Sequence, residues 1–276
     1  MDKKTCLTAR RAATFRTTVY DYYERHGRSF PWRETTDPYR ILVSEVMLQQ
    51  TQAPRVLLKY EEFVHLFPDV STLATASLHD VLGAWQGLGY NRRALSLKQS
   101  AERIVILHGG IVPRDEDSLV SLPGVGPATA RGVRAFAFNE PVVLIETNIR
   151  AVFIHHFFPR EETVADSNLR PLIEKTLDRS NPRRWYNALM DYGTFLKKAH
   201  ANPARRSAHH QIQSPFEGSI RQIRGAILRH ILEKVQLPES DLMNTIDCDM
   251  DLVGEILEQL EREQIIVRGD GNVSIA

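Results

Sequence analysis

The stretch Leu122-Pro-Gly-Val-Gly-Pro-Ala-Thr-Ala130 carries the most informative signal in the chain, a tight glycine-rich turn between two short helical segments. Glycines let a backbone approach a ligand closely, and the N–H groups at the start of the second helix can donate hydrogen bonds to a DNA phosphate. Such contacts do not read the base sequence. The stretch therefore predicts a phosphate-binding helical hairpin over residues 122–134, with a helix–helix turn that contacts nothing as the alternative.

Helical spacing of apolar residues dominates on both sides of this turn. The predicted helices cover residues 39–52, 56–66, 77–85, 92–107, 129–137, 148–158 and 185–197. No strand pattern occurs before the C-terminal region. The expected fold class is therefore mostly α.

The C-terminal region has a different pattern. Residues 200–215 are polar, basic and interrupted by prolines, which is typical of a linker. Beyond them, residues 219–233 and 251–263 have the spacing of amphipathic helices, and residues 265–275 indicate a short hairpin turning at Gly269-Asp-Gly271. This order predicts a winged-helix-like α+β domain, and any small α+β module packed on the first domain is the alternative.

Charge is distributed unevenly along the chain. Residues 214–276 hold 6 Lys/Arg against 12 Asp/Glu, whereas residues 1–213 hold 29 against 22. The front part is thus positive, consistent with a polyanionic partner, while the acidic tail would be repelled by phosphates.

No targeting or membrane signal is evident. No apolar run approaches the roughly 20 residues that a bilayer span needs, and the N-terminus lacks the apolar core of a signal peptide. We therefore expect no membrane association and a cytoplasmic location. The two cysteines, Cys6 and Cys248, are far apart, which argues against a disulfide framework and against a multi-cysteine metal centre.

A second chemical signal follows the hairpin. In Val142-Val-Leu-Ile-Glu-Thr-Asn-Ile-Arg-Ala151, an apolar run places Glu146 at the start of another helix. Cleavage of a nucleoside bond builds positive charge on the sugar, so an ionised carboxylate beside it lowers the barrier or activates water. The alternative is a glutamate that only complements the helix dipole.

The hairpin and a carboxylate 23 residues after Pro123 resemble the endonuclease III superfamily of helix-hairpin-helix base-excision glycosylases. The adenine DNA glycosylase branch is the most similar, because Pro31-Trp-Arg33, Asp37-Pro-Tyr-Arg-Ile-Leu-Val-Ser-Glu-Val-Met-Leu-Gln-Gln-Thr-Gln52 and Trp85-Gln-Gly-Leu-Gly-Tyr90 follow its pattern. The resemblance covers roughly residues 28–200. It implies a two-lobed enzyme, acting as a monomer on double-stranded DNA with a mismatch or lesion, that flips a base and hydrolyses its N-glycosidic bond.

The resemblance also implies lobe boundaries. Residues 37–150 would form a helical module containing the hairpin, and residues 1–36 with 151–204 would form a second helical lobe. A linker over residues 205–214 would then lead to the winged-helix-like domain at residues 215–276.

Site residues carry over by position. Glu45 matches the general acid that protonates the purine, Glu146 the catalytic carboxylate, and Asn148 the side chain that orients it. Gln50 and Tyr90 match residues that enter the base stack beside the flipped nucleotide. The remaining DNA-binding candidates are Thr51, Leu122, Gly124, Val125, Gly126, Ala128 and Thr129, and the base-pocket candidates are Trp32 and Arg33.

Three departures from the family qualify these expectations. Glu146 stands where the family has aspartate, which moves the carboxylate and allows retuning to another base. Ala128 stands where lyase-active relatives carry a Schiff-base lysine, which implies a monofunctional enzyme that uses water. Residues 194–214 lack the four cysteines of the usual iron–sulfur cluster, so we expect no cofactor, apart from a monovalent cation that the hairpin carbonyls could hold.

The expected substrate is adenine opposite 8-oxoguanine or guanine. Two alternatives stay open: a glycosylase for another lesion, such as a deaminated or mismatched pyrimidine, and a non-catalytic protein that binds damaged DNA.

Overall fold

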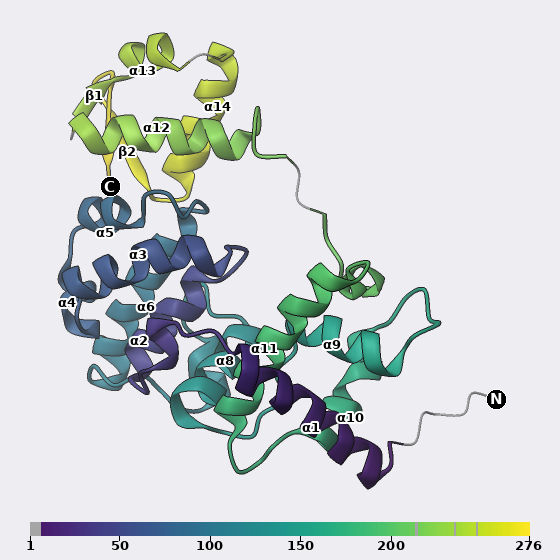
Figure 1. The fold of residues 1–276 in the computed structure, drawn as a ribbon. Helices are drawn as coiled ribbons and strands as arrows, with labels where there is room; N and C mark the ends of the chain where they lie inside the picture. The colour runs from purple at the N-terminus through teal and green to yellow at the C-terminus, as the bar shows by residue number, and fades with distance from the viewer. Residues whose placement is uncertain (1–6, 213–214, 235, 247) are drawn as a thin grey trace. The chain divides into compact units, whose positions relative to one another are not determined.

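The computed structural model describes residues 7–212, 215–234, 236–246 and 248–276, and helices dominate it (Figure 1). Before the C-terminal module, the helices are α1 (Ala9–His26), α2 (Pro38–Met47), α3 (Ala53–Leu66), α4 (Val70–Thr75), α5 (Leu78–Trp85), α6 (Arg92–His108), α7 (Glu116–Val120), α8 (Pro127–Phe138), α9 (Thr147–Phe157), α10 (Asp166–Thr176) and α11 (Pro182–Ala199), with 3-10 turns η1 (Pro31–Arg33) and η2 (Pro203–Arg206). The predicted mostly α class is confirmed.

The chain forms two compact units. Unit 1 contains Met1–Leu42, Arg114–Val120 and Val125–Ile212, and unit 2 contains Val43–Pro113, Ser121–Gly124 and Gln213–Ala276. These units differ from the predicted lobes, because α8 packs on α7 and α11 and therefore belongs with unit 1. The C-terminal module groups with unit 2 through the packing of its first helix on α5.

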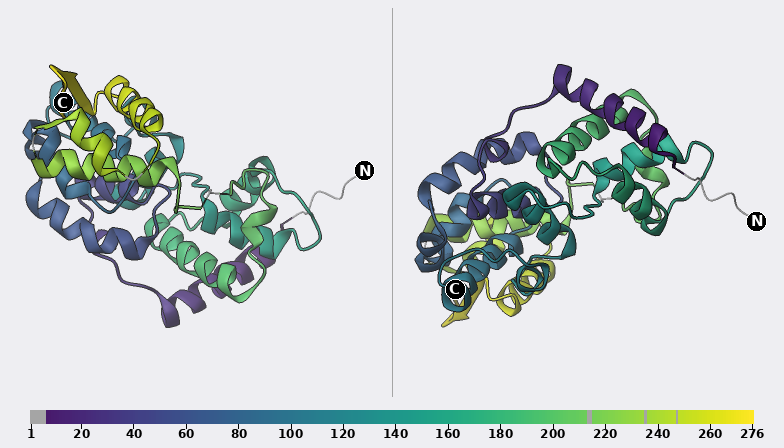
Figure 2. Two further views of the ribbon diagram at one scale, coloured as in Figure 1. Left: turned by 90° about the horizontal axis from the view of Figure 1, so that it is seen from above. Right: turned by 90° about the horizontal axis from the view of Figure 1, so that it is seen from below.

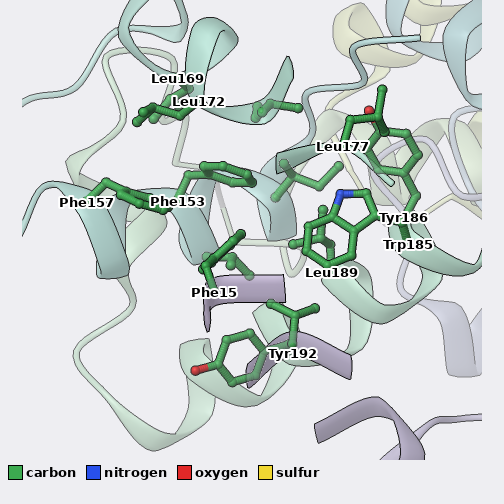
Figure 3. Close-up of a cluster of buried hydrophobic side chains, with 14 of the residues drawn as sticks. Phe15, Phe153, Phe157, Leu169, Leu172, Leu177, Trp185, Tyr186, Leu189 and Tyr192 are labelled. Atoms are coloured by element: carbon green, nitrogen blue, oxygen red, sulfur yellow. The ribbon is translucent and has the colours of Figure 1, made fainter. Parts of the chain in front are cut away.

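Unit 1 is built around α9 and α11, which pack along each other and are covered by α1 and α10. Their interface holds an aromatic cluster in which the Phe15 ring lies 5.2 Å from Phe153 and 5.9 Å from Trp185, centroid to centroid (Figure 3). Trp185 and Phe153 are fully buried. Truncating such an aromatic side chain to alanine typically costs about 3–5 kcal/mol, so this cluster is a principal source of stability for unit 1.

The C-terminal module comprises α12 (Ile220–Lys234), β1 (Gln236–Pro238), α13 (Glu239–Thr245), α14 (Met250–Arg262), β2 (Ile266–Gly269) and β3 (Asn272–Ile275), gathered together in Figure 2. Its strands form an antiparallel sheet in the order β1-β3-β2. Asp270 and Gly271, with φ of 52° and 72°, make the two-residue turn that favours a twisted hairpin. The predicted helices and terminal hairpin are confirmed, and β1 is an addition.

The predicted linker is packed in its first part. Val164 forms a parallel bridge with Ser207, and Arg206 Nη1 donates to the carbonyls of Phe158 and Glu161, the latter at 2.8 Å. Arg206 thus anchors the first part of the predicted linker to unit 1. The end of the predicted linker, residues 213–214, lies outside the described residues.

Among the residues with described structure, no helix is both long and apolar enough to cross a bilayer.

Candidate functional site

The predicted hairpin is present as α7, the loop of residues 121–126 and α8. Leu122 and Val125 are buried and anchor the loop in the protein interior, whereas Gly124 and Gly126 are exposed. Gly124 has φ of 74°, and a Cβ there would lie 2.7 Å from the Ser96 Cβ, so only glycine fits. Gly126 begins α8 without a side-chain cap, which leaves the helix start suited to an anion.

Side chains of unit 2 fix the hairpin loop through its carbonyls. Ser100 Oγ donates to Pro123 O at 2.7 Å, and Arg103 Nη1 donates to Ser121 O at 2.9 Å. Gln49 Nε2 donates to Gly124 O at 3.1 Å. Because Gln49 directly precedes Gln50, this bond ties the hairpin loop to the turn that carries one predicted stacking residue.

Both predicted stacking residues have left-handed backbone conformations. The φ angles are 55° at Gln50 and 51° at Tyr90, which is uncommon for residues other than glycine. The predicted helix over residues 39–52 therefore ends early, at Met47, where the chain turns to place Gln50. Such strain persists only where surrounding contacts fix it, and it is frequent at functional sites.

Arg93 supplies those contacts. Its Nη1 donates to the carbonyls of Met47 at 2.8 Å and Gln49 at 2.6 Å, and its Nη2 donates to Thr51 Oγ1 at 3.0 Å and Gly89 O at 2.9 Å. Burial lowers the pKa of its guanidinium to about 10, so it stays charged at neutral pH. One half-buried cation thus joins the two loops that carry the stacking residues, a role that the sequence analysis did not detect.

Glu146 caps α9. Its Oε1 accepts from the Ile149 N–H at 2.7 Å, and its Oε2 accepts from Asn148 Nδ2 at 3.1 Å. Part of the Glu146 surface is exposed, but its carboxyl group lies among protein atoms. This burial raises the pKa of Glu146. The hydrogen bonds to its carboxyl group and the charges of Lys197 and Arg150 act in the opposite direction but do not outweigh the burial. Glu146 therefore does cap the helix, as the alternative interpretation of the sequence held. It also contacts Asn148, the side chain expected to orient its carboxylate.

Asn148 is held in turn by α11. A Cβ at Gly193 would lie 2.4 Å from Asn148 O, so the close approach of α11 to the start of α9 requires glycine. Thr194 Oγ1 lies 3.3 Å from Asn148 Oδ1, and Met190 Sδ lies 3.7 Å from Asn148 Nδ2. Gly193 and Thr194 are therefore supporting residues of the site that sequence reasoning missed, because nothing local in the sequence pairs α11 with α9.

The predicted base-pocket residues lie in a packed network of unit 1. Arg33 donates from Nη1 and Nη2 to the carboxylate of Asp191, both at 2.9 Å, and Arg28 also binds this carboxylate. Burial would raise the pKa of Asp191, but these two guanidiniums outweigh it and hold the pKa low. Trp32 is buried and stacks on Phe30 at 4.8 Å. Their place in a base pocket remains a prediction.

The remaining candidates are placed as follows. Glu45 lies half-buried on α2 in unit 2, whereas Glu146 belongs to unit 1. In the first turn of α8, Ala128 is exposed and Thr129 is buried. Joint action of Glu45 and Glu146 is therefore part of the proposal below.

The residues present do not fit a four-cysteine iron–sulfur cluster, because the chain has only two cysteines. Cys248 is partly exposed, and Cys6 lies outside the described residues. Within the described part of the chain, no group of three or more His, Cys, Asp or Glu side chains is arranged to hold a metal ion.

A glycine-rich hairpin between α7 and α8, followed by a carboxylate that caps α9, defines a helix-hairpin-helix protein of the DNA repair class. Residues 43–175 match the family model of the HhH-GPD superfamily of base excision DNA repair proteins. The chain is 36% identical over 242 residues to an adenine DNA glycosylase of Mycobacterium tuberculosis, covering 80% of this chain and 79% of the relative. It therefore belongs to this superfamily of DNA glycosylases.

Further similar proteins are also DNA glycosylases or share their fold. Identity to the human adenine DNA glycosylase is 31% over 194 residues, 66% of this chain and 36% of that protein. A thermostable thymine-DNA glycosylase superposes with a TM-score of 0.60 at 26% identity, over 68% of this chain and 88% of its own. An endonuclease III trapped on DNA shares the fold, with a TM-score of 0.56 at 20% identity over 78% and 94% of the two chains. The protein is a DNA N-glycosylase, and DNA is its partner.

Proposed function

We propose that this glycosylase removes adenine mispaired with 8-oxoguanine or guanine and leaves an abasic site. The names of the adenine DNA glycosylase relatives support adenine as the base that is removed. The structural observation that carries the proposal is the carboxylate of Glu146, buried and fixed by Asn148 and the start of α9. A negative charge held in place before reaction stabilises a cationic sugar without reorganisation.

The reaction would proceed by acid-assisted departure of the base. Glu45 protonates the adenine ring, the bond from C1′ to the base breaks, and the electron pair leaves with the base. The Glu146 carboxylate stabilises the positive sugar and takes a proton from the water that adds to C1′. Gln50 and Tyr90 fill the gap left by the flipped nucleotide, while Gly126 and Ala128 at the start of α8 bind a backbone phosphate.

The enzyme would use water as its only nucleophile, because Ala128 has no amine to attack C1′. We propose that it works without an iron–sulfur cluster, as a monomer, in the cytoplasm on nucleoid DNA. The carbonyls of Ser121, Pro123 and Gly124 each accept a side-chain hydrogen bond, so a monovalent cation at the hairpin would have to share these oxygens.

Single-turnover cleavage of a panel of labelled duplexes tests the substrate. The panel carries adenine opposite 8-oxoguanine, adenine opposite guanine, thymine opposite guanine and uracil opposite guanine, each treated with alkali to reveal abasic sites. We expect cleavage of both adenine duplexes by the wild type, and binding without cleavage by Glu45→Gln. Substantial cleavage by that variant would remove Glu45 from the acid role.

A mismatched pyrimidine is the second candidate substrate, because a thymine-DNA glycosylase is among the similar solved structures. Cleavage confined to the thymine or uracil duplexes would favour it. Tight binding with no cleavage of any duplex would favour a protein that only binds damaged DNA.

A further inference from the structure

The acidic C-terminal module places a basic residue beside the loop of residues 87–90, which carries Tyr90. Its first helix, α12, packs on α5, and His79 Nε2 lies 3.1 Å from Leu232 O. These contacts bring the beginning of α12 to the loop of residues 87–90, where Tyr90 is located. Arg221, in the first turn of α12, reaches this tyrosine.

Arg221 contacts Tyr90 in two ways. Its Nη1 donates to Tyr90 Oη at 2.8 Å, and its guanidinium carbon lies 5.6 Å from the centre of the ring. The guanidinium carbon of Arg93 lies 5.5 Å from the same ring centre. The aromatic ring therefore interacts with two guanidiniums, one from its own helical module and one from the C-terminal module.

The two arginines hold different parts of Tyr90. Arg93 bonds to the carbonyls of Leu88 and Gly89 and so fixes the backbone before the tyrosine. The hydroxyl of Tyr90 is the atom farthest from that backbone, and it accepts a hydrogen bond from Arg221 Nη1. A side chain that is ordered before binding loses less entropy when DNA is bound, which preserves affinity.

We propose that Arg221 is a positioning residue that holds the Tyr90 side chain ready to enter the base stack, so that the C-terminal module takes part in lesion recognition. This inference rests on the proposed function, in which Tyr90 replaces lost stacking beside the flipped nucleotide. The overall negative charge of the C-terminal module makes a broad contact with DNA phosphates unfavourable. In this proposal the module acts on DNA binding through the local contact of Arg221 with Tyr90 instead.

The test compares Arg221→Ala, Arg221→Lys, Tyr90→Phe and the double variant Arg221→Ala/Tyr90→Phe. The matched control is Arg229→Ala, an exposed arginine on the same helix. Two quantities are measured on a duplex with 2-aminopurine next to the adenine–8-oxoguanine pair: the dissociation constant and the fluorescence increase that reports base unstacking. Thermal denaturation of each variant checks the fold.

We expect Arg221→Ala to weaken binding about five- to tenfold and to reduce unstacking, because a hydrogen bond from a charged donor is lost. Tyr90→Phe should have a similar effect, and the double variant should be no worse than either single variant. Arg221→Lys should recover part of the loss, since an ammonium can donate to the hydroxyl but cannot lie flat over the ring. Arg229→Ala should match the wild type.

Equal effects of Arg221→Ala and Arg229→Ala, or additive effects in the double variant, would overturn the inference. So would tighter binding by Arg221→Ala, which would make the contact a restraint that DNA must displace. Unstacking does not require cleavage, so the two proposals can fail separately. If the wild type cleaves no duplex but Arg221→Ala still reduces unstacking, the proposed function fails and the positioning role stands.

Discussion

Glu146 combines the structural role of a helix cap with the chemical role that we propose for its carboxylate. Its Oε1 caps α9 at Ile149, and its Oε2 meets Asn148, so the longer side chain has found a fixed position. The burial that raises its pKa makes the ionised form costly in the folded state. A buried carboxyl group with a pKa shifted by its surroundings is frequent at functional sites.

Glu146→Gln should separate the helix-capping role of Glu146 from the effect of its negative charge. The amide oxygen can still accept from Ile149, and no charged form is buried any longer, so we expect the free energy of unfolding at neutral pH to be unchanged or higher. Glu146→Ala should lose about 1 kcal/mol with the cap. Urea denaturation of both variants measures this, and equal destabilisation by the two substitutions would contradict it.

Gly193→Ala, on α11, should displace Asn148 and so disturb the candidate site. The added Cβ would lie 2.4 Å from Asn148 O, so α9 or α11 must shift, at a cost of about 1–3 kcal/mol and with a large loss of cleavage. Gly225→Ala is the control, because α12 leaves open space there and alanine favours a helix. Activity of Gly193→Ala at the wild-type level would show that the position of Asn148 is not critical.

His156 should make the fold sensitive to mild acid. Burial, then the charges of His155 and Arg11, lowers its pKa from 6.5 to about 4. Between these values the unfolded chain binds a proton that the native state does not, so stability decreases as the pH falls through this window. We expect a loss of about 2 kcal/mol from pH 7 to pH 5. His156→Gln should reduce this slope in denaturation experiments, and an unchanged slope would contradict the assignment.

At the scale of elements, apolar spacing predicts most helices around the hairpin and in the C-terminal module. The early end of α2 could not be predicted that way, because it depends on Arg93, which binds the carbonyls of Met47 and Gln49 from more than forty residues away in the sequence. Family motifs predict site roles for positions such as Glu146 and Tyr90, and these roles stay predictions. Roles for Arg93, Gly193 and Arg221 could not be predicted that way, since each acts on a distant segment.

Arg93→Lys should uncouple the two loops that carry Gln50 and Tyr90. A lysine keeps the charge but cannot present the planar set of donors that reaches Met47, Thr51 and Gly89 together. We expect affinity for a mispaired duplex to fall at least about tenfold, with a stability loss of about 1–3 kcal/mol. Arg92→Ala, an exposed neighbour, is the control for charge. Titration of a labelled duplex measures the effect, and equal affinities for the two variants would refute it.

At the scale of the whole molecule, the segment after α11 holds together without cysteine ligands. The bridge between Val164 and Ser207 and the bonds of Arg206 to Phe158 and Glu161 connect this segment to unit 1. These contacts provide a physical alternative to a cluster in stabilising the same part of the chain.

We therefore expect the purified protein to be colourless, to contain no stoichiometric iron, and to keep its activity and melting temperature after treatment with a chelator. Elemental analysis and cleavage assays before and after chelation measure this. Iron bound in stoichiometric amount, with loss of activity on its removal, would contradict the cluster-free proposal.

The most direct test of the account is release of adenine from a duplex with adenine opposite 8-oxoguanine under single-turnover conditions, with and without alkali. We predict that the wild type releases adenine and yields strand breaks only after alkali. Glu146→Gln should bind the duplex but release adenine at least about a hundredfold more slowly, because a preorganised charge at the sugar is lost. Equal release by the wild type and Glu146→Gln, or no release by the wild type, would contradict the claim that Glu146 is the catalytic carboxylate of an adenine glycosylase.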